Sequence, residues 1–214
     1  MKKMMLLPVL FLMAVTAVAQ DSKTFYVNDE KGRDVVTFTS KAPLETIVGK
    51  TSRARGFIEV DINNINSAIN GKFEVDLASV KTGIDMRDGH MRDNYLETEQ
   101  YPKAVFELSR VVESSATVLE DQKPIELKVE GNFTVHGVTK PMIIHLTVTY
   151  FAESESTRPR LPGDLLHIEG TFDIFLTDHN IEIPKFVILK LDDKQVINID
   201  LFSSTGLAPT ETAK

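Results

Sequence analysis

The segment between residues 81 and 108 holds the densest group of side chains that could do chemistry. Side chains three and four residues apart share one face of a helix, and four residues of the segment have this spacing: Arg87, His90, Met91 and Asn94. Guanidinium and imidazolium groups donate hydrogen bonds that suit a phosphate or quinone oxygen. Arg87, His90 and Arg92 are therefore predicted to meet the polar or anionic head group of a ligand.

The same charges also fit a purely structural role. Asp85 can cap the start of a short helix, and Arg–Asp pairs at this spacing would fix the helix to its surroundings. Pro102 then ends the helical region and restarts an extended chain. The residue types leave both roles open for Arg87 and Arg92, whereas a structural role is favoured for His90 taken alone.

The histidines do not predict a metal site. His136, His145 and His167 are expected on the polar, outward faces of different strands, and with His179 they show no HxH or HxxxH spacing. A metal ion needs converging ligands that are themselves held by hydrogen bonds. We therefore expect solvated surface histidines, no metal site and no cofactor.

Motifs for catalysis are missing from the sequence as well. The chain has no GxSxG elbow, no HExxH motif and no glycine-rich phosphate loop. It has no cysteine, which excludes disulfides and a thiol nucleophile. No catalytic residue is predicted, and the protein is expected not to be an enzyme.

The rest of the chain predicts strands. Extended segments are expected at 25–27, 35–39, 44–49, 53–62, around Phe73, at 104–112, 125–135, 142–150 after a turn at 136–141, at 166–176, 186–190 and 196–202. In 125–135, apolar residues or glycine alternate strictly with polar ones, which leaves little room for a helix. Strands of this one-sided kind form an antiparallel sheet that must pack as a sandwich or close as a barrel. Periodicity does not choose between these two folds.

The inward side chains are the candidates for contact with an apolar ligand. A barrel of about eight strands can be filled by side chains or can hold one ligand. The candidate lumen residues are Phe73, Val75, Leu77, Phe106, Leu108, Leu127, Val129, Phe133, Ile144, Leu146, Val148, Ile168, Phe172 and Ile174. Gly131 and Gly170 also face inward, where they would relieve crowding or permit sharp bends.

The N-terminus predicts export. Lys2 and Lys3 precede an apolar run and a small-residue cleavage site at 17–19, so residues 1–19 are expected to be a signal peptide and residues 20–214 a single domain, periplasmic or secreted. Cleavage would leave no stable membrane span. The remaining 22 basic and 31 acidic residues give a net charge of −9, which disfavours nucleic acid and anionic lipid surfaces as partners. Residues 203–214 are expected to form a mobile polar tail.

Several motifs resemble a known family. They are Gly56, Thr82-Gly83, Arg87-Asp88, His90-Met91-Arg92, Tyr95-Leu96-Glu97, Tyr101-Pro102 followed by Phe106, and the run from His136 to Pro141. In this order they resemble the YceI-like family of polyisoprenoid-binding proteins. The resemblance implies an all-β fold: an antiparallel, lipocalin-like β-barrel with an apolar lumen and a short helical plug between two long strands. Segments 153–164 and 176–184 depart from the family pattern, which bears on the exact head-group contacts.

The resemblance also implies a function. The expected role is to carry or sequester an isoprenoid lipid, such as a polyprenyl or isoprenoid quinone-like amphiphile, in the barrel lumen, with a homodimer possible. One alternative is an enzyme that modifies such a lipid at the barrel mouth, with His90 as acid–base. Another is a structural or adhesion barrel without a lumen.

Overall fold

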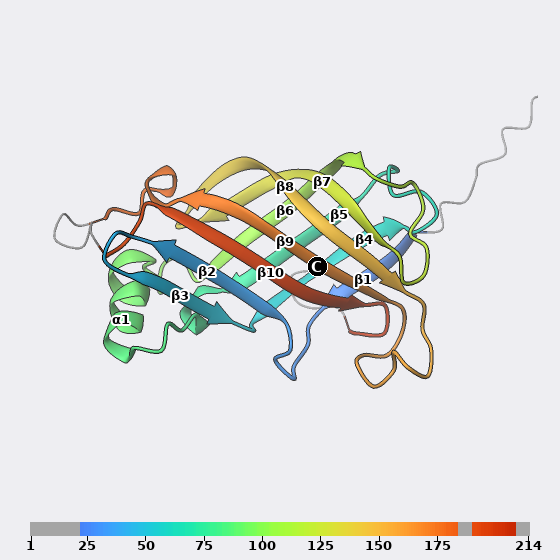
Figure 1. Ribbon diagram of the computed structural model, residues 1–214, viewed down its shortest axis with the longest axis horizontal. Coiled ribbons are helices and arrows are strands. Elements are labelled where there is room, and N and C mark those ends of the chain that lie inside the picture. Colours follow the sequence, from blue (N-terminus) through green and yellow to red (C-terminus); the bar gives the residue numbers. More distant parts are fainter. Residues whose placement is uncertain (1–21, 184–189, 209–214) are drawn as a thin grey trace, which may run out of the picture.

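The fold is one antiparallel sheet that closes into a barrel (Figure 1). The structure, a computed structural model, describes residues 22–183 and 190–208. Its strands are β1 (Ser22–Val27), β2 (Val35–Lys41), β3 (Thr46–Thr51), β4 (Ala54–Asp61), β5 (Asn70–Asp76), β6 (Lys103–Ser114), β7 (Pro124–Val135), β8 (Val138–Phe151), β9 (Leu165–Phe175) and β10 (Lys194–Ser204). The expected all-β barrel is confirmed. Periodicity alone did not distinguish a sandwich from a barrel, and the structure is a barrel.

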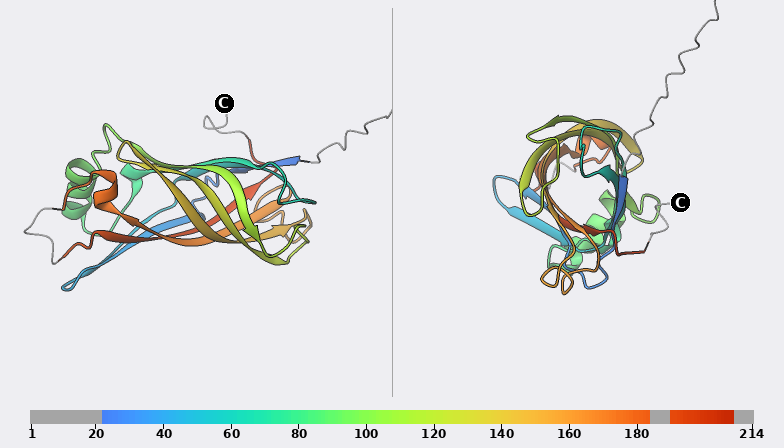
Figure 2. Two further views of the ribbon diagram at one scale, coloured as in Figure 1. Left: turned by 90° about the horizontal axis from the view of Figure 1, so that it is seen from above. Right: turned by 90° about the vertical axis from the view of Figure 1, so that its right-hand side faces the viewer.

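Eight strands form the closed wall, in the order β1-β4-β5-β6-β7-β8-β9-β10, and β10 pairs back to β1 through Ser204 and Tyr26. The end-on view shows these strands surrounding a common axis (Figure 2). Ser203 and Ser204 are fully buried, and the hydroxyl of Ser204 donates to the carbonyl of Pro162. The expected mobile tail was therefore wrong at its start, because these serines complete the strand that closes the barrel.

The β2–β3 hairpin extends this wall at one end. β2 pairs with residues 195–200 of β10, and β3 pairs with β2. At the base of the hairpin the far edge of β3 is held by the backbones of Lys50 and Lys81, which exchange hydrogen bonds of 2.8 and 2.9 Å. The hairpin therefore forms one side of the barrel opening, and the segment that follows β5 forms the other.

In residues 22–183 and 190–208, four short helices accompany the strands: η1 (Leu77–Ser79), α1 (Asp85–His90), η2 (Met91–Tyr95) and η3 (Leu176–His179). α1 continues directly into the π-helix η2, and both lie at the end of the barrel beside the β2–β3 hairpin (Figure 1). This is the helical segment expected between two strands. The expected cap was wrong, because Ile84 occupies the N-cap without a side-chain bond and Asp85 is the first helical residue. None of the helices in the described ranges is both long and apolar enough to cross a membrane.

The hairpin between β7 and β8 is tighter than expected. Val135 pairs with Val138, so the turn contains only His136 and Gly137, with φ of 51° and 71°. Positive φ at both central residues is typical of a type I′ turn, whose twist matches the flanking strands. The remaining residues of the expected turn, 138–141, belong to β8. The expected strand at 186–190 lies outside the described residues except for Lys190, which is in a turn.

The hydrophobic core fills the end of the barrel remote from α1. It contains Phe25, Val60, Ile65, Leu119, Ile125, Leu127, Val129, Ile144, Val148, Tyr150, Leu166 and Ile168. Ile65 and Leu119 come from the β4–β5 and β6–β7 connections, which hydrogen-bond to each other and cover this end. These connections therefore close one end of the barrel, where Ile65 and Leu119 also line the internal cavity, and the other end is open.

Gly131 marks a close approach between strands β6 and β7. A Cβ atom there would lie 2.5 Å from the carbonyl oxygen of Glu107 and 2.5 Å from the ring of Phe106. We expect Gly131→Ala to lower the free energy of unfolding by about 2 kcal/mol, because a backbone atom has to move. Gly89→Ala is the control, since its nearest neighbour is a flexible side chain 4.0 Å away and alanine favours helix. Denaturant unfolding checks both, and equal effects would contradict this account of Gly131.

Candidate functional site: an apolar lumen with a polar mouth

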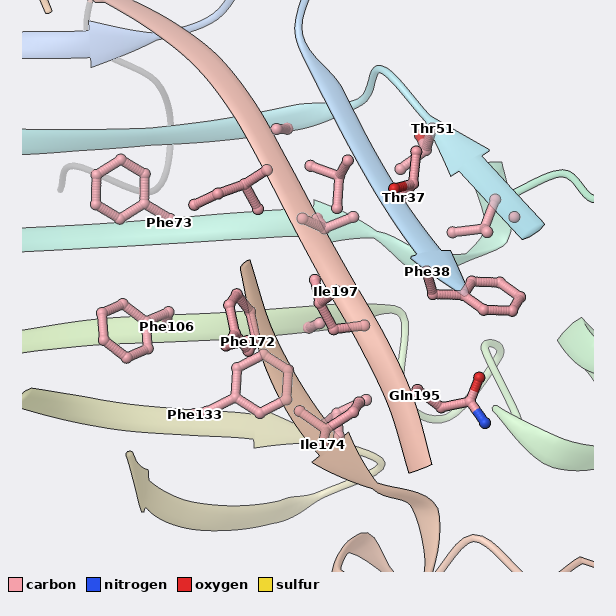
Figure 3. A pocket seen from close by; sticks show the side chains of 18 of the residues that line it. Thr37, Phe38, Thr51, Phe73, Phe106, Phe133, Phe172, Ile174, Gln195 and Ile197 are labelled. Carbon is pink, nitrogen blue, oxygen red and sulfur yellow. The ribbon is translucent and has the colours of Figure 1, made fainter. Parts of the chain in front are cut away.

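The open end of the barrel contains a cavity of about 560 Å³. Figure 3 shows the rings of Phe73, Phe106, Phe133 and Phe172 directed into it from strands β5, β6, β7 and β9. Phe133 and Phe172 meet edge to face with 6.0 Å between ring centroids. The alternation of these strands puts one apolar side chain per two residues inside, so the wall of the cavity is almost wholly apolar.

All fourteen predicted lumen residues line the cavity. Burial separates them into two groups. Leu77, Leu127, Val129, Phe133, Ile144, Val148 and Ile168 are at most 8% exposed and fill the wall and the floor. Phe73, Val75, Phe106, Leu108, Leu146, Phe172 and Ile174 are half-buried and face the open space. Whether either group contacts a ligand stays a prediction.

Some of the lining was missed from the sequence. Val36, Thr37 and Phe38 of β2 line the cavity in succession, and Ile47, Gly49 and Thr51 line it from β3. Val48, the apolar residue between them, is 50% exposed. In the closed wall, apolar side chains point inward and polar ones outward. This alternation does not hold in the β2–β3 hairpin because the hairpin extends beyond the closed wall. Its outer face is therefore not uniformly polar, and its inner face is not uniformly apolar. The sequence signal that could have predicted this lining is the period of two between residues 47, 49 and 51, which places them on one face of a strand.

The mouth lies between α1, the β2–β3 connection and residues 190–195. Ile84 and Met86 line it while remaining 52% and 75% exposed, so the rim is apolar on the side of α1. Gln195 lies on the opposite side, where its side chain donates to Ser40 Oγ at 3.2 Å and to the carbonyl of Asp192 at 2.5 Å. An amphiphile entering here meets apolar groups, with a few fixed polar groups beside them.

Arg87 belongs to a network that ties α1 to the hairpin. Its Nη1 donates to Glu45 Oε1 at 2.5 Å and its Nε donates to Thr82 Oγ1 at 2.8 Å. Asp88 accepts from the backbone N and the hydroxyl of Thr82 at 2.7 and 2.6 Å. Burial raises the pKa of Asp88, but the bonds from Thr82 and the charges of Lys81 and Arg87 outweigh it and lower the pKa overall. The carboxylate therefore holds the start of the helix against the barrel wall.

The three predicted mouth residues are not brought together. Arg87 and His90 line the cavity, and Arg92 does not. Arg92 forms an ion pair with its neighbour Asp93, with 2.8 Å from Nε to Oδ1. Arg92 follows Arg87 by five residues and His90 by two, and neither spacing places side chains on one face of an α-helix. The helix then widens into a π-helix, in which Leu96 N bonds to Met91 O five residues back. Wider turns change which residues share a face, so Tyr95 lines the cavity in place of Asn94.

Three histidines contradict the expectation of solvated surface residues. His167 stacks on Phe202 with 4.2 Å between ring centroids, and its Nε2 is 2.8 Å from Asp200 Oδ1. His136 lies in the β7–β8 turn, where its Nε2 is 2.8 Å from Glu97 Oε2 and its Nδ1 is 3.2 Å from the carbonyl of His179. His179 is only 3% exposed and donates from Nδ1 to the carbonyl of Val138. These bonds fix η2 and η3 to the hairpin. His145 is exposed as expected, and the described residues contain no cluster of three candidate metal ligands.

His179 gives the fold a pH dependence. Burial lowers the pKa of His179, and the hydrogen bond to Val138 offsets this only in part. Because the unfolded state binds this proton more readily, the stability that the neutral ring provides is lost as the pH falls below about 6.5. We expect the free energy of unfolding to fall more steeply between pH 7 and pH 5 in the wild type than in His179→Gln. Identical slopes in denaturant titrations would contradict this assignment.

Comparison with known proteins agrees with this geometry. The YceI-like domain model matches residues 26–202, from β1 to β10. The chain belongs to the YceI-like family. A UPF0312 protein of Shewanella sp. (strain MR-7) is 28% identical over 147 residues, which cover 67% of this chain and 72% of the relative.

Solved structures share the fold. A polyisoprenoid binding domain from Saccharophagus degradans, implicated in plant cell wall breakdown, superposes with a TM-score of 0.63 at 20% identity and covers 86% of this chain and 98% of its own. BcnA from Burkholderia cenocepacia gives a TM-score of 0.63 at 17% identity, with 82% of this chain and 98% of its own covered. At these identities the likeness extends to the barrel and not to the ligand.

Proposed function

We propose that this protein binds an isoprenoid lipid, such as a polyprenyl or isoprenoid quinone-like amphiphile, with its tail in the lumen, and carries or sequesters it. The observation that carries the proposal is the cavity of about 560 Å³ with its half-buried aromatic and aliphatic lining. Binding sites for small apolar ligands are of this kind, with volumes of about 300–1,000 Å³ and a few polar groups that fix orientation. The polyisoprenoid binding domain from Saccharophagus degradans, which shares the fold, supports the ligand class.

The energetics allow tight binding. A lipid of about forty heavy atoms at about 0.3 kcal/mol per atom gains about 12 kcal/mol, which corresponds to a dissociation constant near nanomolar. Part of a long tail could remain in the mouth, where Ile84 and Met86 offer exposed apolar surface. Gln195 and the Arg87–Glu45 pair would meet the more polar end of the molecule.

The place of action follows from the expected signal peptide. Lys2, Lys3 and the apolar run after them predict export to the periplasm or the medium. A long isoprenoid lipid is poorly soluble in these aqueous spaces. A carrier that shields the tail from water fits such a place.

The direct test is to identify what the protein holds. Native mass spectrometry of protein purified without detergent, followed by organic extraction, should show one added mass that is released as an isoprenoid lipid. Protein stripped of lipid should regain that mass on incubation with polyprenol. A protein that carries no lipid and takes up none would favour the alternative of a structural barrel, whereas release of a chemically altered lipid would favour the enzyme alternative.

A further inference from the structure

A second, polar cleft lies outside the lumen, where β3, β4 and η1 meet. It has a volume of about 320 Å³ and is lined by Lys50, Thr51, Ser52, Arg53, Ser79 and Lys81. Its lining thus consists of three cations and three hydroxyl residues. The three cations are the donors that suit an oxyanion, since the hydroxyl of Ser79 already donates to the carbonyl of Asp76 and lies 2.6 Å from the hydroxyl of Thr51.

The three cations form no ion pair. Lys50, Arg53 and Lys81 have no carboxylate within ion-pair distance in the part of the chain that the structure describes, although most other basic side chains there are paired. The charge of Lys81 does act on Asp88, whose pKa it helps to lower. Asp76 accepts from the backbone N of Ala78, and Asp88 accepts twice from Thr82. In a chain with a net charge of −7, three unpaired cations around one cleft form a local positive centre.

The backbone holds the cleft rigid. The Lys50 and Lys81 backbones bond to each other, so their side chains project from one fixed bridge. Thr51 Oγ1 lies 2.6 Å from Ser79 Oγ and accepts from the backbone N of Arg53 at 3.0 Å. Side-chain substitutions at the two lysines leave these bonds intact.

The cleft adjoins the lumen. Thr51 lines both of them, and its bond to Ser79 spans the gap between β3 and η1. An anion bound in the cleft would therefore lie just across the barrel wall from the cavity, beside the bridge that closes the base of the opening.

We propose that this cleft is a binding site for a phosphate-type oxyanion, held by Lys50, Arg53 and Lys81. The oxyanion is either free phosphate or the phosphate of a lipid head group, which present the same oxygens to the site. The site is independent of what fills the lumen, because its lining residues contact the ligand from outside the barrel wall.

The test uses the mature chain at low ionic strength, titrated with inorganic phosphate and followed by the backbone amide NMR signals. We expect saturable shifts at residues 50–53 and 79–81. Lys81→Gln and Arg53→Gln should each weaken binding about tenfold, the usual loss for one charge-assisted bond. Lys41→Gln is the matched control, since Lys41 is exposed, forms no ion pair within the described part of the chain and does not line the cleft.

A second arm separates the two sources. Vesicles of phosphatidylcholine with and without phosphatidylglycerol replace the free anion. Binding that requires phosphatidylglycerol and is lost in Lys81→Gln identifies the head group, and binding of inorganic phosphate alone identifies the free anion. Absence of saturable binding in both arms, or equal weakening by Lys41→Gln and Lys81→Gln, would overturn the proposal. Neutral polyprenol binding, measured in the same variants, should be unchanged and reports on the lumen separately.

Discussion

Replacing Ile197 by Trp is expected to weaken lipid binding about 30-fold. Ile197 is half-buried on β10 between Phe38 of β2 and Phe172 of β9, and all three side chains line the cavity (Figure 3). The Trp side chain has six more heavy atoms than that of Ile and would exclude about six ligand atoms, which at about 0.3 kcal/mol each is about 2 kcal/mol of lost binding free energy. Titration with a fluorescent polyprenol analogue measures the change.

The control is the same substitution on the neighbouring residue. Val196 pairs with Thr39 and Asp173 and does not line the cavity, so Val196→Trp should bind lipid as the wild type does. Circular dichroism and thermal melting establish that both variants are folded. Equal affinity in the two folded variants would mean that the ligand does not occupy the lumen.

Replacing Asp29 by Ala is expected to lower the free energy of unfolding by about 3 kcal/mol. Its side chain is 2% exposed and forms ion pairs with Arg33 at 2.7 Å and with Arg160 at 2.6 Å. Arg160 in turn lies over the ring of Phe202, so the carboxylate joins the β1–β2 turn, the 152–164 loop and β10. Removing one partner of a buried ion pair typically costs about 3–5 kcal/mol. Arg160 Nη2 is also 3.7 Å from Asp34. Because Asp34 would still be near Arg160 after Asp29 is removed, we expect a loss near the lower end of this range.

An exposed pair in the same loop is the control. Arg158 and Glu153 are 3.1 Å apart with side chains 62% and 40% exposed, so Glu153→Gln should change stability by less than about 1 kcal/mol. Denaturant unfolding at pH 7 compares the two. If Asp29→Ala and Glu153→Gln lowered the free energy of unfolding by similar small amounts, the ion pairs of Asp29 would not stabilise the fold as described.

Acid should act through the same carboxylate. Burial alone raises the pKa of Asp29, but hydrogen bonds from Arg33 and Arg160 lower it to about 2. Because the folded pKa lies below the unfolded value of 3.8, its contribution is complete above about pH 4 and is lost as the pH falls from 3.8 through 2. This part of the acid sensitivity should be missing in Asp29→Ala.

The barrel strands were predictable because burial on one side leaves a period of two in the sequence. β7 shows this most clearly, and its inward residues Leu127, Val129 and Phe133 are all buried as expected. The end of β10 was missed for the converse reason. Ser203 and Ser204 are buried by hydrogen bonding instead of by apolar packing, and such burial leaves no periodic signal.

The sequence also did not predict how deeply each inward-facing residue is buried. Val129 and Leu108 both point inward and both line the cavity, yet Val129 is 2% exposed and Leu108 is only half-buried. How far an inward residue is buried depends on its neighbours, among them Ile65 and Leu119 of the two connections that cover one end. The mouth prediction failed for Arg92 because its spacing from Arg87 and His90 does not put the three side chains on one helix face. Tyr95 was missed because a π-helix spaces its faces differently from an α-helix.

The most direct test of a lipid tail in the lumen is photocrosslinking with polyprenol analogues that carry a diazirine at one end or the other, followed by peptide mapping. With the probe at the tail end, we predict adducts on Phe73, Phe106 and Leu108. With the probe at the hydroxyl end, adducts should fall on Phe38, Met86 and Met91 at the mouth. Adducts of both probes on outward apolar residues such as Val112 and Ile143, which are 38% and 53% exposed, would contradict binding in the lumen.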